Sequence, residues 1–226
     1  MKTALVTGAN KGLGLEFVKQ LNQRGYHVIG CCRHPKKAYE LEQIGGEVYQ
    51  LDITKDSDIQ ALKSNLKKRP IDLLINNAGI TGEQGVTVGH VYRDNFLHVL
   101  NVNCVGAILL CDALLPNLLA SNDKHILVMS SSMGSISENE RGRSYAYRAS
   151  KSALNSVMRS FAIDVKQKGV KVMLLHPGWV KTDLGGINAI TDVDVSVKGM
   201  LTQMDNYIDI SHAETVRRYD GGVIAW

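Results

Sequence analysis

Short apolar runs alternate along this chain with longer stretches whose apolar residues recur every three or four positions. The short runs are typical of buried strands, and the longer stretches have the period of amphipathic helices. Strands are predicted at 3–7, 27–32, 47–51, 71–75, 125–129, 171–175 and 222–226, and helices at 16–21, 35–43, 56–68, 94–119, 147–168 and 193–204. This alternation predicts an α/β fold: a single domain, residues 1–226, with a doubly wound parallel sheet of six to seven strands and helices on both faces.

The composition is that of an ordinary soluble domain. The 226 residues are 44% hydrophobic and 21% charged, with a formal net charge of +4. The basic clusters 67–69 and 217–218 are too short to indicate a nucleic-acid surface, so no nucleic-acid partner is expected. No stretch of about 18 residues is uniformly apolar, and the chain starts on a strand-like run. We therefore expect neither a membrane span nor a signal peptide.

The four cysteines, Cys31, Cys32, Cys104 and Cys111, lack the spacing of a metal site. Cys31 and Cys32 are adjacent in an apolar run, which favours reduced, buried thiols over a disulfide. The expectation is a cytoplasmic protein that binds no metal.

The first predicted strand ends in Gly8-Ala-Asn-Lys-Gly-Leu-Gly14, and helical spacing follows from Glu16. Glycine accepts positive φ angles and lets a backbone approach a ligand closely. A helix N-terminus after such a loop presents free N–H groups to a diphosphate. The spacing departs from Gly-x-Gly-x-x-Gly, but strand, glycine turn and helix together predict dinucleotide binding.

The residue after the second strand of a dinucleotide fold meets the adenosine ribose, where an arginine accommodates a 2′-phosphate. Arg33 holds this position, and Lys11 in the glycine loop is a second cation. The alternative is that both are ordinary surface cations, but they favour NADP(H) over NAD(H). Asp52 ends the third strand, where a carboxylate is suited to bind an adenine amino group, to cap the next helix, or both.

Tyr147 and Lys151 are four residues apart and therefore share one face of the helix predicted at 147–168. A nearby ammonium favours the phenolate and lowers a pKa that is ordinarily about 10. The phenol would then exchange a proton near neutral pH, as a general acid does. The alternative is a packed tyrosine beside an exposed lysine.

Three further polar features are ambiguous on their own. Asn103 interrupts an apolar helical stretch, either as a functional amide or as a structural hydrogen-bond partner. Residues 130–132 form a serine turn after the fifth strand, where ligand groups gather in a doubly wound sheet. His176 ends the sixth strand and is interpreted as a packing or hydrogen-bonding residue.

Taken together, these stretches resemble the short-chain dehydrogenase/reductase family over the whole chain. The motifs that carry the resemblance stand in the family's order: Thr7-Gly-x-x-x-Gly-x-Gly14, Asp52, Asn76-Asn-Ala-Gly79, Asn103, Ser131, Tyr147-x-x-x-Lys151 and Pro177-Gly178. Stretches 176–186 and 219–226 also resemble a narrower group, the C-factor-like proteins and sniffer-type carbonyl reductases. The resemblance implies a Rossmann-type fold and an NADPH-dependent reductase of small aldehydes or ketones.

The resemblance also implies a catalytic tetrad, Asn103, Ser131, Tyr147 and Lys151. Tyr147 would be the general acid in reduction, and Lys151 would lower its pKa and bind the nicotinamide ribose. Ser131 would orient the substrate carbonyl, and Asn103 would hold a water that links Lys151 to bulk solvent. Ser131 is preferred to its serine neighbours because it stands three residues before Gly134, as in the family. Residues 138–143 are then extra loop residues before Tyr147.

Further contacts carry over from the family. The implied cofactor contacts are Gly8, Asn10, Lys11, Gly12, Leu13, Gly14, Arg33, Asp52, Ile53, Asn77, Ala78, Gly79, Tyr147, Lys151, Pro177, Gly178, Val180 and Thr182. The implied substrate contacts are Ser131, Met133, Tyr147 and Trp179. Region 185–219 is short for the family, so the substrate cleft should be open. A homodimer through helices 94–119 and 147–168 is expected. The alternative function is a C-factor-like signalling protein that binds NAD(P) and turns it over only incidentally.

Overall fold

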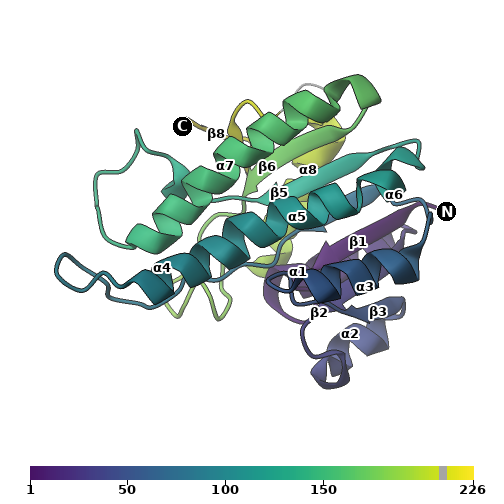
Figure 1. Ribbon diagram of the computed structural model, residues 1–226, viewed down its shortest axis with the longest axis horizontal. Helices are drawn as coiled ribbons and strands as arrows, with labels where there is room; N and C mark the ends of the chain where they lie inside the picture. Colours follow the sequence, from purple (N-terminus) through teal and green to yellow (C-terminus); the bar gives the residue numbers. More distant parts are fainter. Residues whose placement is uncertain (209–212) are drawn as a thin grey trace.

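The computed structural model describes residues 1–208 and 213–226 (Figure 1). Its eight strands form one sheet, in the order β3-β2-β1-β4-β5-β6-β7-β8. Neighbouring strands are parallel except β7 and β8, which pair antiparallel. The strands are β1 Thr3–Thr7, β2 His27–Cys32, β3 Glu47–Gln50, β4 Leu73–Asn76, β5 His125–Met129, β6 Lys171–His176, β7 Val216–Arg218 and β8 Val223–Ile224.

Helices cover both faces of this sheet and form a core on each (Figure 1). They are α1 Gly12–Gln23, α2 Tyr39–Ile44, α3 Asp56–Leu66, α4 Arg93–Leu100, α5 Gly106–Ala113, α6 Leu115–Leu119, α7 Tyr145–Val165 and α8 Val193–Tyr207. Leu5 of β1 belongs to the core under α3, α5 and α7, and Val6 to the core under α1 and α8. Successive strand residues point to opposite faces, so a strand covered on both sides is a continuous apolar run.

The predicted doubly wound parallel sheet is confirmed, and all seven predicted strands lie within two residues of their observed ends. The sheet has eight strands rather than six or seven, because the sequence pattern misses β7. Two of the three β7 residues are arginines, and so short a strand has no apolar period to detect. The predicted last strand is the two-residue β8.

The long helix predicted at 94–119 is interrupted between α4 and α5 by a π-helical turn, Asn101–Val105. Such turns are frequent at functional sites. This turn contains Asn103, whose side chain is 1% exposed. The α-helix resumes at Gly106, where a Cβ would lie 2.4 Å from the Ile53 carbonyl oxygen. Glycine is required there because the helix touches the backbone that follows β3.

The helical run Arg93–Leu119 is long and apolar enough, by length and composition alone, to cross a membrane, with a mean hydropathy of 1.8. Half of its apolar window is nevertheless buried inside the protein. Leu110, Leu114 and Leu118 are fully buried in the core beneath it. A helix that is apolar because it faces a packed core has this composition, and the packing assigns the run to that core.

The four cysteines are free and buried, which confirms the prediction for Cys31 and Cys32. Burial raises the pKa of the Cys31 and Cys111 thiols, so both stay uncharged. In region 185–219, which was expected to border the substrate cleft, the structure places α8 and β7. Residues 209–212 of that region lie outside the described residues.

Candidate active site

The glycine loop connects β1 to α1 in a conformation that other residues resist. Gly8 and Gly12 have φ angles of 63° and 53°. A Cβ on Gly14 would lie 2.1 Å from the Gly8 carbonyl oxygen, so only glycine fits. The first turn of α1 then has N–H groups without helical partners. With the positive end of the helix dipole, they can hold a diphosphate.

The loop after β4 is bonded to the glycine loop. The Asn77 side chain donates to the Thr7 carbonyl oxygen, with Nδ2 and O 2.8 Å apart. The Thr7 hydroxyl accepts from the backbone N–H groups of Asn77 and Ala78, each at 3.0 Å. Gly79 follows, where a Cβ would lie 3.2 Å from Asn103 Oδ1. The Asn-Asn-Ala-Gly motif therefore joins the glycine loop to the π turn.

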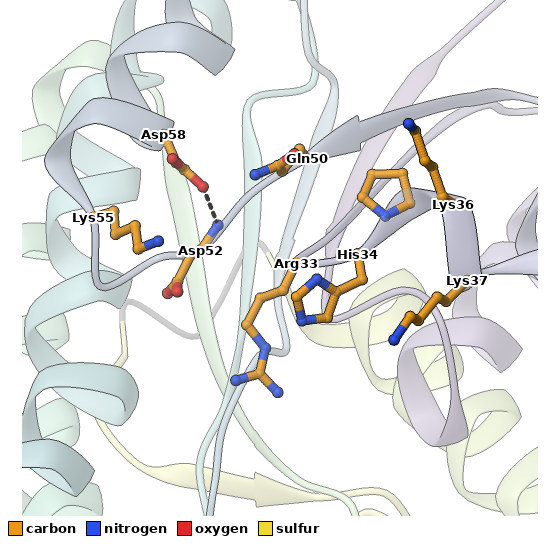
Figure 2. A pocket seen from close by; sticks show the side chains of 9 residues that line it. Arg33, His34, Lys36, Lys37, Gln50, Asp52, Lys55 and Asp58 are labelled. Atoms are coloured by element: carbon orange, nitrogen blue, oxygen red, sulfur yellow. Dashed lines mark hydrogen bonds between the residues drawn. The ribbon is translucent and has the colours of Figure 1, made fainter.

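A pocket of about 500 Å³ opens beyond the ends of β2 and β3 (Figure 2). It is lined by Arg33, His34, Pro35, Lys36, Lys37, Gln50, Asp52, Lys55 and Asp58. Its one arginine and three lysines face two aspartates, a net charge of +2. In Figure 2 the Arg33 and Lys37 side chains extend on either side of His34, whereas Lys36 points away from them. Such a cationic pocket suits a phosphate monoester.

Asp52 lies at the edge of this pocket and caps the turn before α3. Its Oδ1 accepts from the Thr54 N–H at 3.1 Å and from the Thr54 hydroxyl at 2.7 Å. Burial works to raise the Asp52 pKa, but these hydrogen bonds and the charges of Lys55 and Arg33 lower it overall. The alternative that Asp52 caps the next helix is wrong, because α3 has Lys55 as its N-cap without a side-chain hydrogen bond, and Asp52 caps the preceding turn instead. Its carboxylate stays ionised beside the pocket. The next residue, Ile53, is buried.

The side chains of the glycine loop lie outside the pocket that Arg33 lines. Lys11 Nζ lies 2.6 Å from Asp183 Oδ2 in the segment after β6, and both side chains are exposed. The hydrogen bond from Lys11 and its charge lower the Asp183 pKa. Lys11 does not line the Arg33 pocket, so the structure does not bring these two predicted cations together. Asn10 is exposed, and Leu13 packs against the core under α1 and α8.

Ser131, Tyr147 and Lys151 converge beyond the end of β5. The Ser131 side chain is close enough to the Tyr147 hydroxyl to oppose the rise in its pKa. Lys151 Nζ lies 5.8 Å from the centroid of the Tyr147 ring and donates to the Met129 carbonyl oxygen at 2.7 Å. Ser131 Oγ also accepts from the Met133 N–H at 3.1 Å. Ser131 and Lys151 are 7% and 5% exposed, so their polar groups act where water is excluded.

Asn103 is held by three hydrogen bonds. Its Oδ1 accepts from the Ile80 N–H at 2.8 Å, and its Nδ2 donates to the Ile80 carbonyl oxygen at 2.8 Å and to Ser150 Oγ at 2.9 Å. The Ser150 hydroxyl donates in turn to the Tyr147 carbonyl oxygen at 2.8 Å. The structural alternative for Asn103 is therefore present, because this side chain ties the π turn to the helix that begins at Tyr145.

The Tyr147 pKa does not follow the expectation from spacing. Burial raises it, and the Ser131 side chain only partly opposes that rise. Burial also lowers the Lys151 pKa to about 8, against an opposing effect of Cys104. The prediction of a lowered Tyr147 pKa is therefore wrong, because desolvation disfavours the charged forms of both the phenol and the amine.

The segment after β6 returns to the glycine loop. Gly178 follows Pro177 with a φ angle of 86°. Val180 is buried, and Thr182 Cγ2 lies 3.3 Å from where a Cβ on Gly12 would be. Of the predicted cofactor contacts in this segment, Thr182 is therefore beside the loop suited to a diphosphate.

The two remaining predicted substrate contacts lie on short, irregular segments. Met133 is half-buried in the turn directly after Ser131. Trp179 is 51% exposed, and its indole Nε1 donates to the Gly185 carbonyl oxygen at 2.7 Å. A large half-exposed ring fixed by its polar atom offers an apolar surface to a ligand.

Sequence reasoning missed two sets of residues that the structure adds. Lys37 and His34 join Arg33 in the cationic pocket. Ser130 and Asn155 form a buried hydrogen bond between β5 and α7. Spacing could have indicated Lys37 and Asn155, because they stand four residues after the predicted site residues Arg33 and Lys151, respectively.

Comparison with known families settles the class of the protein. The short chain dehydrogenase family matches residues 2–189. The chain belongs to this family. As a short-chain dehydrogenase it is an oxidoreductase, in agreement with the prediction from the motifs.

Its relatives include the narrower group that the sequence resembles. C-signal from Myxococcus xanthus is 36% identical to this short-chain dehydrogenase over 168 residues, which is 74% of this chain and 100% of that protein. NADPH-bound carbonyl reductase from chicken fatty liver has a TM-score of 0.93 at 32% identity, covering 100% of this chain and 99% of that one. Carbonyl reductase Sniffer of D. melanogaster has a TM-score of 0.91 at 32% identity, with both chains covered to 100%.

Proposed function

We propose that this short-chain dehydrogenase is a carbonyl reductase that uses NADPH to reduce a small aldehyde or ketone to an alcohol, with Tyr147 as general acid. The observation that carries the proposal is the convergence of three polar groups: the buried Ser131 hydroxyl beside Tyr147, and the buried Lys151 amine 5.8 Å from the centroid of the Tyr147 ring. The carbonyl reductases among its structural neighbours support the substrate class.

The residues present fit NADPH. The N–H groups at the start of α1 would hold the diphosphate, and Arg33 with Lys37 would hold the 2′-phosphate. Asp52 and Ile53 would border the adenine, and Lys151 would bind the nicotinamide ribose. The other proposed contacts are Gly8, Asn10, Lys11, Gly12, Leu13, Gly14, Asn77, Ala78, Gly79, Pro177, Gly178, Val180 and Thr182. When bound, the cofactor supplies the hydride, while the protein supplies orientation and the proton.

Tyr147 is suited to donate that proton. Its raised pKa keeps the hydroxyl protonated at neutral pH, and it would donate to the substrate oxygen as the carbonyl carbon is reduced. The Ser131 hydroxyl would bind the same oxygen and hold it beside Tyr147. The Lys151 ammonium would stabilise the phenolate that is left, because charges attract more strongly where water is excluded. Asn103 would orient a water that returns the proton.

Two measurements together test the proposed function. Fluorescence titration with NADPH shows whether the cofactor binds, and NADPH oxidation with a panel of aldehydes and ketones shows whether a carbonyl is reduced. Binding with reduction of at least one carbonyl supports the proposal. Binding without turnover of any carbonyl would reject it and favour the signalling alternative.

The alternative is a protein that signals by binding NAD(P), and it has one specific observation in its favour. C-signal aligns over its whole length with this chain. A protein that only binds the cofactor, however, has no need of a desolvated Ser131, Tyr147 and Lys151 arranged around one point. The enzyme is therefore the better-supported function.

Alkaline pH should reduce turnover through Lys151. Its pKa of about 8 means that the amine loses its charge as the pH rises through that value, and with it the charge that stabilises the Tyr147 phenolate. We expect kcat/KM for reduction to be highest below about pH 8 and to fall above it. Lys151→Arg keeps a charge at this position and should move the fall to higher pH. A flat profile between about pH 7 and 9 would contradict the assignment.

A homodimer is the expected assembly. Apolar side chains are exposed along α4, the π turn, α5 and α7, where Leu97, Val105, Leu109 and Ile163 are 55%, 44%, 42% and 56% exposed. Two such faces related by a two-fold axis would cover each other. Light scattering at micromolar concentration should give twice the chain mass, and Ile163→Glu should lower it to one chain. Tyr39→Glu, on the exposed side of α2, is the control, and a monomeric wild type would refute the assembly.

A further inference from the structure

Two hydrogen bonds fasten α7 to the turn that carries Ser131. On one side of Ser131, the Ser130 hydroxyl donates to Asn155 Oδ1 at 2.5 Å. On the other side, the Ser152 hydroxyl donates to the Gly134 carbonyl oxygen at 2.8 Å. Ser131 is therefore flanked by two attachments to the helix that carries Tyr147. Figure 1 shows α7 running along the sheet above β5 and β6.

The bond between Ser130 and Asn155 is the buried one of the two. Ser130 is 3% exposed and Asn155 is 2% exposed, whereas Ser152 is half-buried. A hydrogen bond shielded from water is stronger and more narrowly fixed in geometry than an exposed one. The Ser130 N–H also donates to the Leu175 carbonyl oxygen of β6 at 2.7 Å, so its backbone is fixed to the sheet.

We propose that Asn155 is a positioning residue for the reaction: by holding Ser130 it sets the place of the Ser131 hydroxyl opposite Tyr147. This rests on the proposed function of Ser131 and Tyr147. Asn155 is one helical turn beyond Lys151 on the buried side of α7, so it does not contact the reacting atoms directly. Its effect is transmitted through one covalent step, from Ser130 to Ser131.

The amide of Asn155 has a second consequence, because it is neutral. A carboxylate would accept the same bond from Ser130, and it would not leave an unpartnered, buried Nδ2 as Asn155 does. It would, however, place a negative charge beside the Ser130 hydroxyl, one residue from the Met129 carbonyl oxygen to which the Lys151 amine donates. The titratable groups next to this amine are Tyr147 and Cys104, and neither carries a charge at neutral pH.

The test compares Ser130→Ala, Asn155→Leu and the double variant by kcat, by KM for NADPH and by the ¹³Cζ resonance of Tyr147. Each single variant should lower kcat at least ~10-fold, the scale of a displaced catalytic group, with KM for NADPH unchanged. The double variant should be no worse than the more affected single variant. The Tyr147 resonance should move toward its position in Ser131→Ala, because both changes remove the Ser131 hydroxyl from its place beside Tyr147.

Asn117→Leu is the matched control for loss of a buried asparagine. Asn117 is 1% exposed and donates to two carbonyl oxygens, those of Lys67 and Arg69, at the other end of the sheet. It should lower thermal stability without changing kcat per folded molecule or the Tyr147 resonance. Equal loss of kcat in the control, additive losses in the double variant, or an unmoved Tyr147 resonance would overturn the proposal.

Asn155→Asp tests the role of neutrality. It keeps the acceptor for Ser130, so it should retain most of the kcat that Asn155→Leu loses. The fall in kcat/KM at alkaline pH that is assigned to Lys151 should move up by about one pH unit or more. An unchanged pH profile of kcat/KM would overturn this role of the neutral Asn155 amide. If the wild type reduces no carbonyl, the proposed function fails. The Tyr147 resonance in Ser130→Ala and Asn155→Leu then still decides whether these residues position Ser131.

Discussion

Tyr147→Phe should lower carbonyl reduction by at least ~10²-fold, the lower end of the range for general acid catalysis. The substitution keeps the aromatic ring and its packing but removes the hydroxyl beside Ser131. The loss should appear in kcat rather than in the affinity for NADPH, because the proposed diphosphate and 2′-phosphate contacts lie elsewhere, at the start of α1 and in the Arg33 pocket.

Single-turnover hydride transfer is the appropriate measurement, because slow product release can hide a change in chemistry. Tyr145→Phe is the matched control. It removes a hydroxyl from the same helix, two residues before Tyr147. It should react at close to the wild-type rate. Hydride transfer by Tyr147→Phe at the wild-type rate would mean that the proton comes from another group.

The apolar pattern predicts most of this fold because the central strands are buried on both faces. The run 125–129 is detected as β5 without ambiguity, since a strand with helices above and below has no polar face. The same reasoning fails for β7, which pairs with β6 through three residues. A strand of that length depends on pairing with its neighbours, here β6 and β8, rather than on its own sequence.

The motif residues were predictable where the backbone itself demands them. Gly14 is an example, because a Cβ there would overlap the Gly8 carbonyl oxygen. Ionisation was not predictable in the same way. Spacing places Lys151 one turn beyond Tyr147, but it does not reveal that both groups are desolvated, and burial decides the direction of both pKa changes.

Contacts between distant segments could not be predicted from the sequence either. Lys11 and Asp183 are 172 residues apart, and only the return of the chain after β6 brings them together. Ser130 and Asn155 meet because α7 packs across the end of β5. Such contacts depend on the relative placement of whole elements, which local periodicity does not encode.

Arg33→Asp should reverse the cofactor preference from NADPH to NADH. The wild-type side chain reaches into a pocket with a net charge of +2, and the substitution lowers that charge to zero while placing a carboxylate where the 2′-phosphate would bind. A charged hydrogen bond is lost and repulsion replaces it, so the ratio of the two dissociation constants should change on the order of 10²-fold. NADH has no 2′-phosphate, and its affinity should stay nearly constant.

Lys36→Asp is the control for this change, since it alters the charge of the same pocket equally, but its side chain points away from Arg33 (Figure 2). Its effect on the ratio should be small at low salt and vanish at high salt, as for a distant exposed charge. The effect of Arg33→Asp should shrink with salt but persist, because a direct contact is lost. Titration of both cofactors by fluorescence at two salt concentrations separates these cases. Equal wild-type affinities for NADPH and NADH would exclude Arg33 as the residue that selects the cofactor.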